Sequence, residues 1–578
     1  MAFRFRRVWG RVAFVAAVAS LAAGCASAPP DGHSTRKTDY EKGHVSSALS
    51  GYLAGRFAQG VGDSQAAAGY FAAALKHDPD NMELLQRSFG LMTTEGRLDV
   101  AAPLAERVLA FDADEPLPLV VAGLEDARNG RWSKAVSRFQ LLPQRGIHGI
   151  LGPLLLAWAK LGDGTDPAVA IDALDALNKT KGLEPLRAYH AALIADLGGK
   201  VQGAEDGYKG ALSSQLSVRG IEAAGSWFQR SGRLDEAKAI YGRYAKEHPD
   251  SLLFDSGRLL AQGAAIARTV PTAQDGLAEA LFDIASLMRQ GNASELAMLY
   301  ARLALWIRPD LALAQTTVGD LLTAHNRLAE ANRFYLGVAP DLPAATYGRL
   351  RAAINLDDMN KMDQAVAELD RLSTSKAAGL EALVTKGDVL RRHKRFAEAA
   401  EAYGKAVERI GAGLQPHHWS LLYSRGISYE RSKQWMKAEA DFLAALRLKP
   451  EQPDVLNYLG YTWVDMGINL DRAKAMLEKA VELRPKDGAI VDSMGWALYR
   501  LGDFQGAVKI LERAVELKPE DPTINDHLGD AYWQIGRAEE AMFQWVRASG
   551  LDPEPEQVDQ LRLKIQTGEV PAKPAGHP

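Results

Sequence analysis

The segment DSMGWALYRLGDFQGAVKILERAVELKP, residues 492–519, decides the fold. Two neighbouring segments align with it: NYLGYTWVDMGINLDRAKAMLEKAVELRP at 457–485 and DHLGDAYWQIGRAEEAMFQWVRASGLDP at 526–553. The three superimpose at a spacing of 34 or 35 residues. Self-similarity at a fixed period of about 20–50 residues is typical of repeat architectures, so these segments predict an array of helical repeats.

One small residue marks the repeat along most of the chain. An alanine recurs at eight spacings of 34 residues, three of 33 or 35, and two longer ones of 60 and 39. The positions are Ala67, Ala101, Ala135, Ala170, Ala204, Ala237, Ala297, Ala331, Ala365, Ala399, Ala438, Ala473, Ala507 and Ala541. The sequence therefore predicts about 14 repeats between residues 43 and 555.

Three further positions of the repeat have packing reasons. A glycine twelve residues before the alanine allows two helices to approach closely, as at Gly123, Gly225, Gly319, Gly387, Gly426, Gly495 and Gly529. A large residue four after the alanine shares its helix face, as at Phe71, Phe139, Tyr208, Tyr241, Tyr335, Tyr403, Phe442 and Trp545. A proline is expected to end the second helix at Pro79, Pro249, Pro309, Pro343, Pro450, Pro485, Pro519 and Pro553.

This pattern resembles the tetratricopeptide repeat over about nine-tenths of the chain. The resemblance implies an all-α, superhelical solenoid of antiparallel helix pairs, helix A and helix B, around a concave groove. The longest alanine spacing contains a Pro/Gly/Thr/Asp break at 267–276 (ARTVPTAQDG), which predicts a joint between two subarrays. Such a joint could separate two binding surfaces.

Composition excludes several classes of protein. The chain has 578 residues, of which 47% are hydrophobic and 24% charged, a balance typical of folded proteins. The formal charge of -4 gives no electrostatic reason to expect nucleic acid as a partner. Cys25 is the only cysteine, which excludes an intrachain disulfide and a cysteine-based zinc site.

The N-terminus has the anatomy of a signal peptide. Arg4, Arg6, Arg7 and Arg11 precede an apolar run from Val12 to Ala23, and no acidic residue lies among them. As a helix that run is about 18 Å long, too short for a hydrocarbon layer of about 30 Å. It ends in Leu21-Ala22-Ala23-Gly24-Cys25, which resembles the bacterial lipobox, and the resemblance implies lipidation of Cys25. Ala26 after the cysteine resembles the pattern of lipoproteins of the Gram-negative outer membrane.

These features divide the chain into seven segments. We expect a lipoprotein signal peptide at 1–24, the lipidated cysteine and a flexible tether at 25–42, and an N-terminal array of about six repeats at 43–250. An irregular helix and joint at 251–276 lead to a C-terminal array of about eight repeats at 277–555. A capping helix at 556–569 covers the last repeat, and a disordered tail follows at 570–578.

Motifs for catalysis do not emerge from the sequence. It contains no HExxH, GxSxG, P-loop or complete GxGxxG motif, so we predict no catalytic residue, no metal and no cofactor. A polar repeat groove is also a poor place to shift the pKa of a catalytic group. The chain is therefore predicted not to be an enzyme.

The resemblance places helix A along the concave groove, and so assigns candidate partner contacts in the four C-terminal repeats. The groove candidates are Tyr423, Asn457, Tyr461, Asp465, Asp492, Trp496, Tyr499, Arg500, Asp526, Asp530 and Trp533, with Ile427, Glu430, Arg431, Val464 and Gln534 at equivalent positions. Aromatic anchors among polar groups would suit an extended segment or a helix of a partner protein. In the alternative interpretation, Trp496 and Trp533 only pack between successive A helices.

The array and the lipobox together resemble periplasmic lipoproteins that act as adaptors for carboxyl-terminal processing proteases. The resemblance implies a non-catalytic scaffold that is lipid-anchored in the outer membrane, faces the periplasm, and brings a protease to substrates such as cell-wall hydrolases. Three alternatives stay open: a scaffold for assembly or export of an outer-membrane or cell-envelope component, an enzyme, and a purely structural tether. The partner's identity and the oligomeric state are not predicted.

Overall fold

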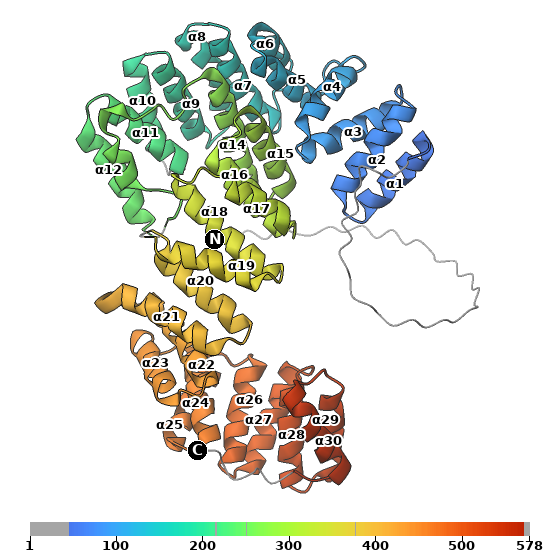
Figure 1. Cartoon of the computed structure of the whole chain (residues 1–578), viewed down its shortest axis with the longest axis vertical. Helices are drawn as coiled ribbons and strands as arrows, with labels where there is room; N and C mark the ends of the chain where they lie inside the picture. Colours follow the sequence, from blue (N-terminus) through green and yellow to red (C-terminus); the bar gives the residue numbers. More distant parts are fainter. Residues whose placement is uncertain (1–44, 214–216, 250, 376, 571–578) are drawn as a thin grey trace. The chain divides into compact units, whose positions relative to one another are not determined.

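The computed structural model describes residues 45–213, 217–249, 251–375 and 377–570, and all regular structure in these ranges is helical (Figure 1). The predicted lipobox, the lipidation site Cys25, the tether and the tail from 571 lie outside the described residues. The chain divides into two compact units after Pro79, a boundary that the sequence analysis does not predict.

The first unit contains one antiparallel helix pair, α1 (Ala48–Gly60) and α2 (Ser64–His77). The second unit begins with helices in the N-terminal range: α3 (Met82–Thr94), α4 (Leu98–Leu109), α5 (Pro116–Arg128), α6 (Trp132–Gln140), α7 (His148–Gly162), α8 (Pro167–Ile171), η2 (Asp172–Lys179), α9 (Glu184–Leu197), α10 (Val201–Ala211), α11 (Val218–Arg230) and α12 (Leu234–Glu247). The predicted joint holds two short helices, α13 (Ser256–Ala261) and η3 (Gly263–Ala265).

The second unit continues through the C-terminal range in regular helix pairs. These are α14 (Ala273–Gln290), α15 (Ser294–Ile307), α16 (Ala312–Ala324), α17 (Leu328–Leu336), α18 (Pro343–Asp358), α19 (Met362–Ser373), α20 (Gly379–Arg392), α21 (Phe396–Ile410), η4 (Gly411–Gly413), η5 (Pro416–His418), α22 (Trp419–Arg431), α23 (Trp435–Leu448), α24 (Pro453–Met466), α25 (Leu470–Leu483), α26 (Gly488–Arg500), α27 (Phe504–Leu517), α28 (Pro522–Gln534), α29 (Ala538–Ser549) and the final α30 (Pro555–Thr567).

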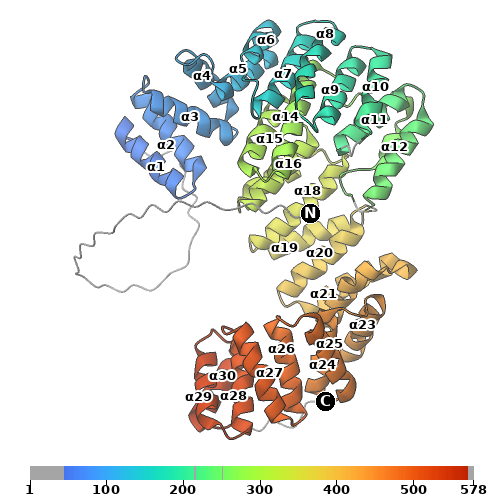
Figure 2. The ribbon, with the colours of Figure 1, turned by 180° about the vertical axis from the view of Figure 1, so that it is seen from behind.

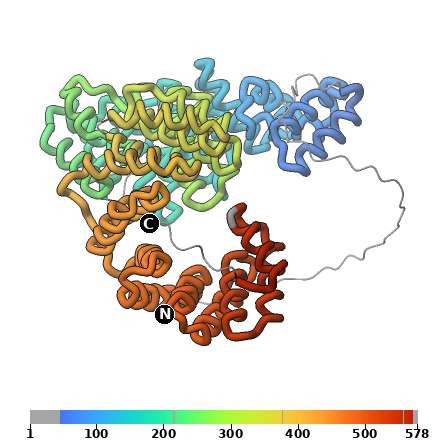
Figure 3. The backbone as a smooth tube through the Cα atoms, turned by 60° about the horizontal axis from the view of Figure 1, so that its bottom comes forward, coloured from blue at the N-terminus to red at the C-terminus, as the bar shows by residue number. Residues whose placement is uncertain are grey.

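Helix pairs stack on one another in chain order, which confirms an all-α solenoid of antiparallel pairs. From α22 to α30 each helix packs on the next one in the chain, and the row is visible in Figures 1 and 3. The exact domain boundaries given above stay predictions.

The residues that mark the repeat form its core. All fourteen repeat alanines, from Ala67 to Ala541, are 0% exposed. Each glycine lies against the large residue of its own repeat: a Cβ atom on Gly319 would come within 2.5 Å of the Tyr335 ring, and one on Gly426 within 2.7 Å of the Phe442 ring. The predicted close approach of helices A and B is therefore confirmed at these positions.

One predicted helix stop is wrong. Pro343 does not end a helix B; it is the first residue of α18, after α17 has ended at Leu336. Proline suits the first position of a helix because its missing N–H would have no partner there and its φ is already helical. At most of the other repeat prolines the preceding helix ends two residues earlier, as α25 does at Leu483 before Pro485.

The first helices after the joint turn back into the N-terminal array. Helix α14 packs on α7 and also contacts α5 and α9, while α15 contacts α3 and α5. Figures 1 and 2 show α14 to α16 within the arc formed by α3 to α12. The joint therefore does not separate two open binding surfaces, since the A helices of the N-terminal repeats from α3 to α9 already hold a part of the same chain.

The described helices are short or amphipathic. None of them combines enough residues with enough hydropathy to span a lipid bilayer.

Candidate functional site

The groove candidates lie on four successive A helices, α22, α24, α26 and α28. We call the surface that these four helices form the A-helix face. Each of these helices packs against the B helix of its own repeat, and α24, α26 and α28 also contact one another in sequence. Residues about 35 positions apart on the A-helix face are therefore neighbours in space. The structure brings most of the candidates together in this way.

Three aromatic rings stack at the centre of the A-helix face. The centroid of the Trp496 ring lies 4.0 Å from that of the His527 ring, at an interplanar angle of 15°. It lies 4.7 Å from the centroid of the Tyr499 ring, at an interplanar angle of 8°. Trp496 and Tyr499 belong to α26, whereas His527 belongs to α28. Trp496 thus joins two A helices, as the packing alternative predicts, yet it and Tyr499 keep part of their surface in solvent.

His527, which the sequence analysis did not single out, is held by a buried carboxylate. Nδ1 of His527 lies 3.0 Å from Oδ1 of Asp492 on the preceding A helix. Burial by itself lowers the pKa of His527, but the negative charge of Asp492 and its hydrogen bond outweigh burial, and the pKa is raised. A protonated imidazole over Trp496 adds a cation–π attraction to the stack.

A second link joins α24 to α26 closer to solvent. Nη1 of Arg500 donates to Oδ1 of Asp465 over 2.7 Å. Burial raises the pKa of Tyr461 on α24, helped by the negative charges of Asp492 and Asp465. The side chain of Asp465 is 46% exposed, which makes it the most accessible charge in this link.

The last repeat is covered by the predicted capping helix. Nζ of Lys564 in α30 lies 2.7 Å from Oδ1 of Asp526 and 2.7 Å from Oδ1 of Asp530, and all three side chains are buried. Trp533 donates from Nε1 to the Gly568 carbonyl at 3.0 Å. Asp526, Asp530 and Trp533 are therefore contacts of the cap, and the accessible part of the A-helix face lies on α22, α24 and α26.

Tyr423 and Asn457 lie apart from the stack. The Tyr423 ring packs at 6.0 Å from Phe442 and 5.9 Å from Tyr458, and burial raises the pKa of Tyr423 to about 12. Asn457 is half-buried, and its Oδ1 atom has no hydrogen-bond partner among the described residues. Between these positions, the Tyr458 hydroxyl donates to Glu430 at 2.9 Å.

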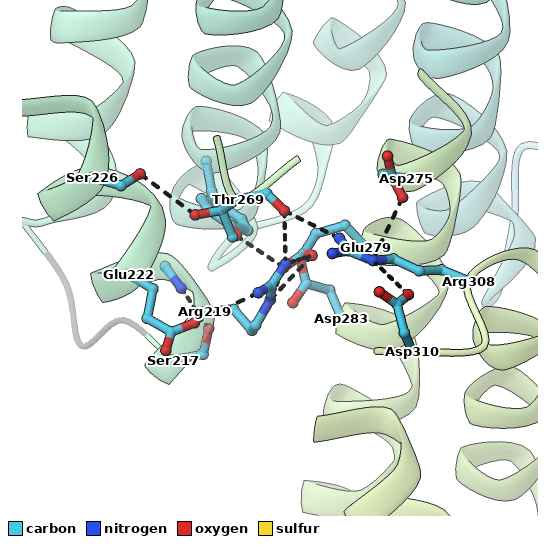
Figure 4. A network of polar contacts seen from close by, with 12 residues as sticks. Ser217, Arg219, Glu222, Ser226, Thr269, Asp275, Glu279, Asp283, Arg308 and Asp310 are labelled. Atoms are coloured by element: carbon cyan, nitrogen blue, oxygen red, sulfur yellow. Dashed lines mark hydrogen bonds and ion pairs between the residues drawn. The ribbon is translucent and has the colours of Figure 1, made fainter. Parts of the chain in front are cut away.

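The equivalent surface of the N-terminal repeats is occupied by the chain itself (Figure 4). Glu279 of α14 is fully buried and accepts hydrogen bonds from Arg219 of α11 at 2.7 Å and from Tyr189 of α9 at 2.9 Å. Burial acts to raise the pKa of Glu279, but the charge of Arg219 outweighs it and the pKa is lowered. This carboxylate is therefore charged at neutral pH.

Further polar contacts fix α14 and α15 in place. Nε2 of His190 in α9 lies 3.1 Å from Oδ2 of Asp283, and its Nδ1 accepts a hydrogen bond from Nε1 of Trp158 at 3.0 Å. Arg302 of α15 lies 3.0 Å from Glu330 and bonds to the Thr94 carbonyl at the end of α3. Sequence periodicity did not reveal these residues, because it reports packing within a repeat and between neighbours in the chain.

No group of three or more metal-ligating side chains occurs in the ranges that the structure describes.

Comparison with known proteins identifies the repeat. A tetratricopeptide repeat model matches residues 350–415 and 493–554, and a second one matches 223–251. The chain therefore carries tetratricopeptide repeats. A TPR repeat-containing protein of Pseudomonas aeruginosa is 27% identical over 198 residues, which is 34% of this chain and 32% of that protein. Human tetratricopeptide repeat protein 13 is 30% identical over 164 residues, 28% of this chain and 18% of that protein.

The match thus spans a third or less of the length of these two curated relatives. Among solved structures, yeast Tom70 is 15% identical with a TM-score of 0.33, over 90% of this chain and 95% of that one. A chain of the APC/C hetero-tetramer Cut9–Hcn1 is 14% identical with a TM-score of 0.36, over 90% of this chain and 96% of that one.

Proposed function

We propose that this chain is a non-catalytic scaffold that binds protein partners through the A-helix face of its C-terminal repeats. Tetratricopeptide repeats generally mediate protein–protein interactions, which supports the coarse assignment. We choose this surface because α14 and α15 occupy the corresponding surface of the N-terminal array. Because α14 and α15 pack against the A helices from α3 to α9, that surface is not open to a partner, whereas the half-buried aromatic rings and exposed charges of α22 to α26 are.

The finer proposal is an adaptor in the bacterial envelope. The lipobox at Leu21 to Cys25 supports a lipid anchor in the outer membrane, with the repeats facing the periplasm. The resemblance to adaptors of carboxyl-terminal processing proteases supports a role in bringing such a protease to its substrates, for example cell-wall hydrolases. The second candidate function is a scaffold for assembly or export of an outer-membrane or cell-envelope component.

Affinity capture distinguishes these two functions. The protein is tagged, expressed at its native level, captured from detergent-solubilised envelope, and its companions are identified by mass spectrometry. Recovery of a processing protease together with a cell-wall hydrolase supports the adaptor. Recovery of a porin, a polymer synthase or an assembly factor in their place overturns the adaptor and supports the second function.

The anchor has a separate test. Cys25→Ser removes the thiol that lipidation requires, so the protein is expected in the soluble periplasmic fraction while the wild type sediments with membranes. Continued sedimentation of the Cys25→Ser protein after washing with salt would contradict lipid anchoring, whatever the capture experiment finds.

A further inference from the structure

A cavity of about 300 Å³ lies where the joint meets the returning array, and we call it the joint cavity. Its walls come from α11, from α13 and the segment that follows it, and from the first turns of α16 and α18. Four arginines line it: Arg219, Arg258, Arg268 and Arg308. Figure 4 shows Arg219 and Arg308 at this place, both donating to the carbonyl of Thr269.

Three of the four arginines already have a carboxylate partner. Arg219 pairs with Glu279 at 2.7 Å, Arg268 with Asp196 at 3.2 Å, and Arg308 with Asp310 at 3.2 Å. These guanidinium groups are therefore compensated within the fold. They set the polarity of the cavity but leave little charge for a ligand.

Arg258 differs from the other three. Its side chain makes no ion pair in the described part of the chain, and its buried Nε atom has no hydrogen-bond partner. The nearby Glu222 pairs with Arg219 at 3.5 Å; burial raises the pKa of Glu222, although the charges of Arg219 and Arg258 act to lower it. A buried donor without an acceptor is unfavourable, so the site around Arg258 favours an incoming anion.

Two helix N-termini also favour an anion in the joint cavity. Leu311 and Leu342 are the N-cap residues of α16 and α18, and neither supplies a side-chain hydrogen bond to the first turn. Both residues line the joint cavity. Uncapped N–H groups and the positive end of the helix dipole attract an anionic group.

Apolar side chains also line the joint cavity, beside the polar residues Ser226, Gln262 and Asp310, and the lining reaches the surface. Leu253, Leu259, Ile266 and Leu313 face the cavity. The side chains of Arg268 and Asp310 are 42% and 77% exposed, so the lining extends from the interior to solvent. A ligand can therefore enter from outside.

We propose that the joint cavity binds a small organic carboxylate with an apolar body. The carboxylate is held by Arg258 and the first turns of α16 and α18, and the apolar body contacts the leucine and isoleucine side chains. A ligand of this kind would bridge α11, α13 and the returning array, and would stabilise the turned-back arrangement by mass action. This site is separate from the A-helix face, so it does not depend on the proposed function.

Titration calorimetry on the purified full chain tests the proposal with hexanoate as the probe. Hexanoate is expected to bind at one site, and hexanamide, which keeps the apolar body but lacks the charge, about tenfold or more weakly. Arg258→Gln should weaken hexanoate about tenfold or more, since a charge-assisted hydrogen bond is lost. Arg243→Gln, an exposed arginine on α12 that does not line the cavity, is the matched control and should leave the affinity unchanged.

Thermal unfolding of both variants shows whether they are folded like the wild type. No saturable binding of hexanoate, or equal binding to wild type and folded Arg258→Gln, would overturn the proposal. Binding of inorganic phosphate as tight as that of hexanoate would overturn the assignment of an apolar ligand. Binding of hexanamide equal to hexanoate would show that the cavity selects no charge, which also contradicts the proposal.

Discussion

Nη2 of Arg219 lies 2.7 Å from Oε2 of Glu279, although the two residues are 60 positions apart in the chain. The contact joins α11, an A helix of the N-terminal repeats, to α14, the first helix after the joint. Tyr189 of α9 donates to the same carboxylate. The N-terminal array therefore holds a later segment of its own chain through side chains of its A helices.

Glu279→Gln should loosen α14. Removal of one partner of a buried ion pair typically costs about 3–5 kcal/mol, because the charge of Arg219 loses its main counter-ion. We expect faster hydrogen exchange throughout α14 and a lower free energy of local opening.

The control for this change is Glu295→Gln, an exposed position at the start of α15. It should change the free energy of local opening of α14, as measured by hydrogen exchange, by no more than about 0.5 kcal/mol. Unchanged exchange of α14 in Glu279→Gln would contradict the importance that we give to the ion pair.

Gly387→Ala should destabilise its repeat. A Cβ atom there would clash with the ring of Tyr403, which is buried beneath the glycine. Overpacking of a core typically costs about 1–3 kcal/mol, so the thermal unfolding midpoint should fall.

Gly404→Ala is the matched control in the next helix. A Cβ atom at Gly404 meets nothing within 4 Å, and alanine favours a helix over glycine by up to about 1 kcal/mol. The thermal unfolding midpoint of Gly404→Ala should therefore stay unchanged or rise. A similar fall of the midpoint in both variants would contradict close packing as the reason for the repeat glycine.

Lys564→Met should release the capping helix. The variant leaves the carboxylates of Asp526 and Asp530 buried without their shared cation. We therefore expect the free energy of unfolding of this end of the array to fall by about 3 kcal/mol or more. Hydrogen exchange of α30 should increase sharply. Arg562→Met, an exposed position in the same helix, should leave exchange in α30 close to that of the wild type.

The C-terminal end should become more stable as the pH falls from 8 to 6. The folded pKa of His527 is raised above its unfolded value, so its contribution is present at low pH and is lost as the pH rises through the folded pKa. Burial and the charge of Asp526 raise the pKa of Asp530 to about 6, so folding also favours the protonated carboxyl below that pH.

Exchange rates of α28 and α29, corrected for the intrinsic effect of pH, measure this trend. Asp492→Asn removes the charge that acts on His527 and should flatten the trend between pH 8 and 6. A protection that rises with pH in the wild type would contradict the assigned protonation states.

The repeat core could be predicted from the sequence because its spacing is local. Glycine, alanine and aromatic positions are fixed by contacts within one repeat, so the 34-residue period identifies them. The turns between helices A and B carry a second periodic signal, a residue at positive φ, as at Gly130, Gly502 and Gly536. Such a position favours glycine or asparagine.

The return of α14 could not be predicted in this way. Arg219, Tyr189 and His190 have partners 60 to 93 positions away, and no periodic pattern relates them. The candidate residues of the A-helix face were predicted from the register, but the register alone could not show which of them the cap covers. Lys564 lies outside the repeats, and only the structure places it on Asp526 and Asp530.

Photo-crosslinking in cells tests the central claim most directly. A benzophenone amino acid is placed at Asp465 on the A-helix face, and at Glu478, an exposed carboxylate on helix B of the same repeat, as the control. We predict that illumination joins the Asp465 variant to a defined partner protein and leaves the Glu478 variant without that product. A partner captured equally from both positions, or from Glu478 alone, would contradict binding through the A-helix face.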